Sequence, residues 1–330
     1  MISRDEAPVG LHRFAIVTAV ATFVLIFAGG LVTSTGSALA VPDWPLSFGK
    51  FFPRMEGGVL YEHGHRMIAG TVAIMTLVLM VWTLMREGRA RVRYVAIGAF
   101  GLVIVQAVLG GLTVLLLLPL AIAVAHAATA QAFFGLMVTL AMLTGSRWRD
   151  ASPSGQVESA RSSLPVLATI TTAAIYCEIL IGAVMRHMGA GLAVPDFPLS
   201  FGRLVPPLDS KFVAINFDHR CGALVVSTLI VWTVTHTLRS YSNEPMLRRP
   251  ATGLIILLVL QICLGAATVL TGRVVVLATS HVAVGAAVLA TSLVLTLRAY
   301  RLLGAGARTH GSARIPVLAP RRRIENEVMA

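Results

Sequence analysis

Long apolar runs alternate with short polar connections along almost the whole chain. A helix that crosses a bilayer needs about 20 mostly apolar residues. Eight runs meet this requirement, and we predict membrane spans at residues 12–33, 61–85, 94–116, 121–144, 164–186, 213–238, 251–271 and 275–299. A membrane β-barrel is excluded, because its strands would give alternating segments of about ten residues. The pattern therefore predicts an all-α integral membrane protein.

The first apolar run could also be interpreted as a secretory signal. Basic residues precede it, and Ala38-Leu39-Ala40 resembles a cleavage site of small residues. The run is too long for the apolar core of a signal peptide, however, and the Leu-Ala-Val-Pro-Asp sequence around its end recurs deep in the chain. We therefore expect a retained helix.

Composition agrees with a membrane protein. Of the 330 residues, 56% are apolar and 13% are charged, with a mean hydropathy of +0.80, whereas soluble domains carry about 25% charged residues. These values exclude a soluble enzyme, a disordered chain and a disulfide scaffold. The three cysteines, Cys177, Cys221 and Cys263, show no C-x-x-C spacing, and we expect them to be small buried packing residues.

The formal net charge of +12 describes topology and gives no reason to expect nucleic-acid binding. The N-terminus, the even-numbered connections and the C-terminal tail hold 19 of the 27 Lys and Arg residues. Basic residues concentrate on the cytoplasmic side of membrane proteins. We therefore predict that both termini are cytoplasmic, which agrees with an even number of spans.

The chain is a duplication in sequence. Three landmarks recur at offsets of 153, 154 and 155 residues: GSALAVPDWPLSFGK (36–50) with GAGLAVPDFPLSFGR (189–203), His65-Arg66 with His219-Arg220, and His126 with His281. Four spans in each half make the repeat parallel. We predict two four-helix bundles related by a pseudo-twofold axis: an N-terminal bundle at 1–146, a cytoplasmic linker at 147–163, a C-terminal bundle at 164–300 and a basic cytoplasmic tail at 301–330.

Four histidines occupy matched places in this repeat: His65, His126, His219 and His281. Each lies one or two turns inside the outer end of its predicted span. Two imidazoles from separate helices at similar depth suit the ligation of a haem iron. Any one of them could instead be a packed, hydrogen-bonded residue. Zinc is disfavoured, because two histidines without a cysteine leave a tetrahedral site incomplete. The matched set predicts metal or haem binding.

Glu62 distinguishes the two halves, because Asn216 occupies the aligned position. Glu62 precedes His65 by three residues and so shares its helix face. Its carboxylate is therefore a candidate catalytic base or cation stabiliser. The alternative is that it orients His65 by accepting a ring proton.

Four other polar residues lie close to these histidines in sequence or span. Arg66 and Arg220 could pair with haem propionates at the outer surface or extend to lipid headgroups. Gln106 and Gln261 lie in otherwise apolar spans, and we expect them to form hydrogen bonds between helices.

Several motifs together are specific: GGLVTSTGSALAVPDWPLSFG (29–49), EHGHR (62–66), PDFPLSFG (195–202) and DHR (218–220), with His126 and His281. In this combination the chain resembles the haem A synthase family over roughly residues 12–300. Members oxidise the C8 methyl group of haem O to a formyl group, giving haem A for terminal oxidases. The resemblance implies a haem-dependent oxidoreductase of the bacterial inner membrane.

The resemblance also implies roles for individual residues. His219 and His281 would hold a b-type haem in the C-terminal bundle. His65 and His126 would face the substrate haem O, and Glu62 matches the acidic residue that the family needs. Haem O synthase as the supplier of substrate and a second copy of the chain are the expected partners, and the electron acceptor is left open.

Two departures from the family are visible. Many members carry a cysteine pair in the first outer loop, and this chain has none there, so no mechanism that needs the pair operates here. Several relatives also carry an arginine where Thr33 and Ser34 stand.

Two rival functions fit parts of the pattern. A di-haem b-type cytochrome that exchanges electrons with quinol would explain the histidines but not the difference between Glu62 and Asn216. A transporter built from parallel repeats would need more polar residues at the membrane midplane.

Overall fold

The computed structural model describes residues 8–151 and 163–303, and this part of the chain is helical without a strand. The helices are α1 (Val9–Ser34), α2 (Gly58–Arg86), α3 (Ala90–Leu115), α4 (Leu120–Thr144), the short α5 (Ser146–Arg149), α6 (Leu164–His187), the 3₁₀ turn η2 (Ala190–Leu192), α7 (Lys211–Ser240), α8 (Pro245–Leu270) and α9 (Val275–Leu303). Eight of them are long and apolar enough to cross a membrane. The predicted all-α membrane fold with eight spans is therefore confirmed.

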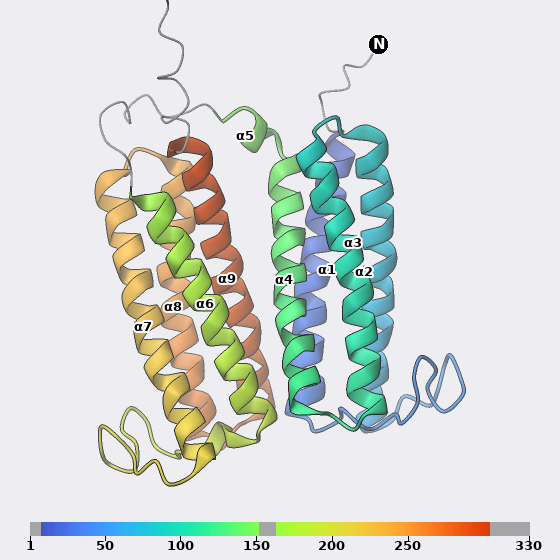
Figure 1. Ribbon diagram of the computed structural model, residues 1–330, viewed down its shortest axis with the longest axis vertical. Coiled ribbons are helices and arrows are strands. Elements are labelled where there is room, and N and C mark those ends of the chain that lie inside the picture. The colour runs from blue at the N-terminus through green and yellow to red at the C-terminus, as the bar shows by residue number, and fades with distance from the viewer. Residues whose placement is uncertain (1–7, 152–162, 304–330) are drawn as a thin grey trace, which may run out of the picture.

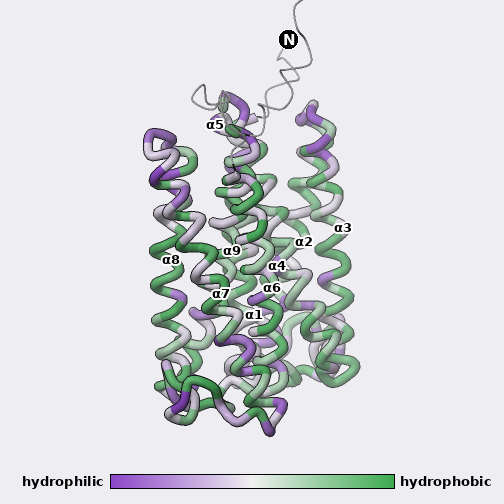
Figure 2. The backbone as a smooth tube through the Cα atoms, turned by 60° about the vertical axis from the view of Figure 1, so that its left-hand side comes forward, coloured by the Kyte–Doolittle hydropathy of each residue, from purple (hydrophilic) through white to green (hydrophobic). Residues whose placement is uncertain are grey.

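The long helices form two groups that stand side by side (Figure 1). Helices α1–α4 make one group and α6–α9 the other, and α5 lies between them near the end that carries the N-terminus. The two long loops, 35–57 and 188–210, both lie at the opposite end, which we call the loop end, one beneath each helix group. Hydrophobic residues follow the helix shafts and hydrophilic residues gather at both ends (Figure 2).

Each group has its own apolar core. Phe133, Met137 and Leu79 are at most 2% exposed in the first group, and Ile230 and Leu254 are fully buried in the second. Lipid tails are as apolar as leucine, so packing in a membrane depends on close van der Waals contact between helices. Small residues at these contacts allow it, and the large apolar residues on the outer faces can meet lipid.

The two groups meet along α1 and α4 on one side and α6 and α9 on the other. The Tyr176 hydroxyl of α6 donates to the Ala128 carbonyl of α4 at 3.0 Å. Near the loop end, the Thr279 hydroxyl of α9 donates to the Ser34 hydroxyl of α1 at 2.9 Å. Arg186 of α6 also reaches α1, where its guanidinium donates to Ser34 at 2.7 Å. These polar contacts fix the groups to each other at several depths.

The prediction of buried cysteines is wrong. Cys177, Cys221 and Cys263 are all unpaired and exposed on the helix surfaces. A thiol behaves as a small apolar group, and no hydrophobic force drives such a group away from lipid. Burial could therefore not be inferred from residue type in a chain of this kind.

Helix α8 begins six residues before the predicted span, because it accommodates Pro250 inside the helix. A proline has no N–H, so the Met246 carbonyl four residues earlier loses its helical partner. Arg298 of α9 replaces that partner, and its guanidinium donates to the Met246 carbonyl at 3.0 Å. The arginine thus completes the hydrogen bonding of α8 and joins it to α9.

We expect Arg298→Ala to lower the free energy of unfolding by about 1–3 kcal/mol, because a carbonyl loses a charged donor. Pro250→Ala supplies the missing N–H and should remove much of this cost in the double variant. Unfolding of the purified variants in detergent measures both effects as a double-mutant cycle. Additive effects would show that Arg298 does not replace the proline's missing donor.

Candidate functional site

The loop 35–57 is folded around a tight turn at Ser47–Lys50. Phe48 and Gly49 have φ values of 53° and 70°, which is typical of a turn with both central residues left-handed. The Asp43 carboxylate accepts from the Phe48 and Gly49 N–H groups at 2.7 and 2.8 Å. These two backbone hydrogen bonds lower the pKa of Asp43. The second loop has the same turn and the same direction of pKa shift, with Asp196, Phe201 and Gly202 in these places.

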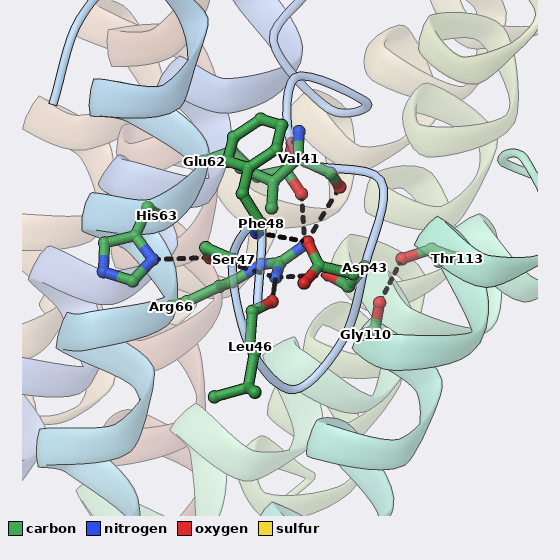
Figure 3. Close-up of polar contacts among 10 residues, drawn as sticks. All are labelled: Val41, Asp43, Leu46, Ser47, Phe48, Glu62, His63, Arg66, Gly110 and Thr113. Carbon is green, nitrogen blue, oxygen red and sulfur yellow. Dashed lines mark hydrogen bonds and ion pairs between the residues drawn. The ribbon is translucent and has the colours of Figure 1, made fainter. Parts of the chain in front are cut away.

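Arg66 and Glu62 of α2 fasten the first loop to the helix (Figure 3). The Arg66 guanidinium donates to the carbonyls of Asp43 at 2.7 Å and Leu46 at 2.9 Å. It also donates to Glu62 Oε1 at 2.6 Å, while Glu62 Oε2 accepts from the Val41 N–H at 2.9 Å. Glu62 is only 4% exposed. One carboxylate oxygen thus contacts the loop and the other contacts Arg66, and neither contacts His65.

Asn216 and Arg220 of α7 do the same for the second loop. The guanidinium of Arg220 donates to the carbonyls of Leu199 and Val194, each at 2.9 Å, and to Asn216 Oδ1 at 3.0 Å. The Asn216 amide donates to the Ala190 carbonyl at 2.9 Å. The first loop presents an N–H at this point and the second presents a carbonyl, so a carboxylate suits one and an amide the other.

The predicted propionate contacts of Arg66 and Arg220 stay a prediction. In this structure both guanidinium groups bind loop carbonyls, a role that the sequence did not indicate. His63 is a further anchor, because its Nδ1 lies 2.7 Å from the Ser47 hydroxyl (Figure 3). Phe217 aligns with His63 in the second half, so this anchor belongs to the first loop alone.

Each of the four matched histidines packs against a glycine of the neighbouring helix. A Cβ added to that glycine would lie about 3 Å from the ring, which is tighter than ordinary contact. The pairs and distances are Gly29 with His65 Nε2 at 3.1 Å, Gly110 with His126 Cε1 at 3.1 Å, Gly182 with His219 Cε1 at 2.9 Å, and Gly265 with His281 Cε1 at 3.0 Å. The glycines let α1 approach α2, α3 approach α4, α6 approach α7 and α8 approach α9 at the histidine.

The two glutamines link the histidines to a neighbouring helix. Gln106 Nε2 donates to the His126 carbonyl at 3.0 Å and lies 3.3 Å from His126 Nε2. Gln261 Nε2 lies 3.4 Å from His281 Nε2, and His281 Nδ1 lies 3.2 Å from the Gln261 carbonyl. The prediction that these glutamines bond between helices is confirmed, for α3 with α4 and for α8 with α9.

His219 and His281 lie close to each other in the second group, with their rings nearly perpendicular. Their ring centroids are 6.5 Å apart and their planes are 84° apart. Bonds between a metal ion and an imidazole are about 2 Å long, so two imidazoles on opposite sides of one ion have centroids roughly 6 Å apart. The spacing therefore fits a single iron between the rings. Within the described ranges, no group of three or more His, Cys, Asp or Glu forms a metal cluster.

Sequence reasoning missed another acidic residue of the site, Glu178 of α6. Its Oε1 lies 2.6 Å from His219 Nδ1. Leu25 aligns with Glu178 in the first half, so the repeat itself contained the signal: an acid in one half opposite leucine in the other.

Matched histidines within apolar helices, each packed against a glycine of the next helix, define a class of helical membrane protein with candidate ligand-binding histidines in each helix group. Comparison with known proteins identifies the family to which the chain belongs. Residues 54–293 match the model of the family described as "Cytochrome oxidase assembly protein". This match covers most of the chain, which therefore belongs to that family.

Similar curated proteins carry the name "Heme A synthase". One from Symbiobacterium thermophilum is 30% identical over 256 residues, which cover 76% of this chain and 82% of that protein. One from Shouchella clausii is 28% identical over 79% of this chain and 87% of its own length. One from Halalkalibacterium halodurans is 28% identical over 82% of this chain and 92% of its own length.

The two arginine anchors can be tested independently, because each loop carries a trypsin site at the same point of its turn. We expect Arg66→Ala to speed trypsin cleavage after Lys50 by about tenfold, since lost hydrogen bonds to a charged donor favour local opening. Cleavage after Arg203 should stay at its original rate. Arg220→Ala should give the reverse, and equal acceleration at both sites in either variant would contradict separate anchoring.

Proposed function

We propose that this protein is a haem A synthase, which oxidises the C8 methyl group of haem O to a formyl group for terminal oxidase assembly. Family membership and the names of its relatives support this function over a quinol-linked di-haem cytochrome. Within the structure, one observation carries it: two pairs of histidines, each ring held against a glycine, lie in two separate helix groups. Two haem sites in one chain are what a haem-dependent enzyme with a haem substrate needs.

In this proposal, His219 and His281 hold a resident haem b. The ring spacing of 6.5 Å supports the assignment. In both rings Nδ1 lies near an oxygen, Glu178 Oε1 for His219 and the Gln261 carbonyl for His281. For His219 that arrangement leaves Nε2 to bind a metal ion, whereas His281 Nε2 also lies 3.4 Å from Gln261 Nε2. Bound there, the haem would supply one-electron redox chemistry.

His65 and His126 receive the substrate haem O in the first group. Both rings are half-buried and packed against glycine, as in the second group. The loop 35–57, held by Arg66 and Glu62, lies at this end of the group. Glu62 lies one helical turn from His65, and we assign its carboxylate the role of accepting a proton released as the methyl group is oxidised.

The wider arrangement follows from the same proposal. The first helix group, 1–146, is the substrate bundle and the second, 164–300, the cofactor bundle, joined by the linker 147–163 and related by a parallel internal repeat. The matched histidine–glycine contacts and matched loop turns support the repeat. The distribution of basic residues supports two cytoplasmic termini, with the basic tail 301–330 on that side. We place the protein in the bacterial inner membrane. Haem O synthase as supplier and a homo-oligomer remain part of the proposal.

Glu62→Gln tests the assigned proton acceptor. The amide oxygen can still accept from Arg66 or Val41, as the Asn216 amide does from Arg220, so we expect the loop and the bound haem to be retained. Formation of haem A should fall by about 10²-fold or more, because a general base contributes 10²–10⁴-fold. Chromatography of haems extracted from cells that also make haem O measures the conversion.

The matched control is Glu87→Gln, which alters another carboxylate–arginine pair, with Arg89, near the opposite end of α2. It should convert haem O at the original rate. Normal conversion by Glu62→Gln would return Glu62 to a structural role. Extraction of haem B alone from the original protein, despite a supply of haem O, would favour the cytochrome.

A further inference from the structure

Glu178 is an acidic side chain within a membrane-spanning helix. It lies in the middle of α6, and its side chain is 12% exposed. Its Oε1 is 2.6 Å from His219 Nδ1, and among the described residues neither carboxylate oxygen nor this ring nitrogen makes a hydrogen bond, so the contact is one of close approach. Ionisable groups in apolar helices are costly and are generally functional. The position of Glu178 therefore indicates that its carboxylate acts on His219.

The surrounding helix is shaped for this carboxylate. Gly222 of α7 faces Glu178, and a Cβ on Gly222 would overlap Oε2. In the first half, the aligned residues are Leu25 and Ile68. One half thus has two apolar side chains where the other has an acid and the glycine that makes room for it. The two differences fit each other, which a chance acidic substitution would not explain.

The carboxylate also distinguishes His219 from the other three histidines. His126 and His281 contact the glutamines Gln106 and Gln261, and His65 has Leu25 at the position that corresponds to Glu178. A carboxylate this close to Nδ1 favours the tautomer that carries its proton on Nδ1, and this leaves Nε2 as a more basic ligand. A more basic ligand and a nearby negative charge stabilise ferric over ferrous iron.

We propose that Glu178 is a positioning residue that orients His219 and lowers the reduction potential of the haem bound there. This inference rests on the proposed function, because it takes His219 to be a haem ligand. In the substrate site Leu25 stands at the corresponding position, so a carboxylate beside the histidine from this helix distinguishes the resident haem site.

The test compares full-length variants purified with their haem. Glu178→Leu combined with Gly222→Ile copies the packing of the first half and so preserves the fold. At a fixed potential, we expect its ratio of ferric to ferrous resident haem to fall about tenfold, an upward shift of about 59 mV for a one-electron couple. Glu178→Gln keeps an acceptor but loses the charge, and should shift the potential in the same direction by less.

Tyr176→Phe is the matched control, because it removes one hydrogen bond of α6, to the Ala128 carbonyl, without touching His219. Its potential should equal that of the original protein. Unchanged potentials in both Glu178 variants would overturn the inference, and leave Glu178 as a link between α6 and α7. Loss of the b-type haem from both Glu178 variants, with Tyr176→Phe intact, would support the orienting role.

If the proposed function is wrong, the haem measurements give a different result. In that case the original protein carries no b-type haem, or His219→Ala retains it unchanged. An intact b-type haem that depends on His219, with a potential indifferent to Glu178, contradicts only the inference about Glu178.

Discussion

The close contact between an imidazole and a glycine backbone is the constraint on which the rest of the structure depends. A histidine in an apolar helix needs space and a fixed orientation, and neither comes from the hydrophobic effect in lipid. At Gly182 and Gly265 the missing Cβ lets the partner helix reach the ring. The same contact sets the distance between the paired helices near the loop end. The same contact between histidine and glycine therefore determines both the packing of the helices and the placement of the ring.

The loops depend on the same helices. Arg66 and Arg220 each follow a histidine directly in sequence, so the helical turn that aims the imidazole inward also aims the guanidinium at the loop. The tight turns held by Asp43 and Asp196 give the loops carbonyls in fixed positions for these donors. Both carboxylates have a lowered pKa, so the stability that they give is complete above the ordinary value of 3.8. It is lost only as the pH falls through the lowered value.

The difference between the halves is local and chemical. The backbone arrangement of histidine, glycine and loop turn is the same in both, whereas the residues beside the rings are not. Glu62 faces a loop N–H where Asn216 faces a carbonyl, and Glu178 with Gly222 takes the place of Leu25 with Ile68. One architecture thus provides two pairs of histidines whose electrostatic surroundings differ, as the proposed division into a substrate site and a cofactor site requires.

Much of the fold could be predicted from the sequence, because apolar runs of sufficient length leave helices as the only option in a membrane. The predicted ends of the helices were less accurate where a side chain of another helix completes the backbone hydrogen bonding, as Arg298 does for α8. The four histidines and the two glutamines were predictable from the repeat. Their glycine partners, the loop contacts of Arg66 and the contact of Glu178 were not, since each depends on which helix faces which. The prediction for the cysteines was wrong because residue type does not distinguish a protein core from a lipid-facing surface.

The central claim is that the second helix group holds the resident haem and the first receives the substrate. The visible absorption spectrum of the purified protein tests it most directly. We expect His219→Ala and His281→Ala each to abolish the b-type spectrum, and His65→Ala and His126→Ala to retain it. Unchanged spectra in the first pair, or equal loss in all four variants, would contradict the division of roles between the two groups.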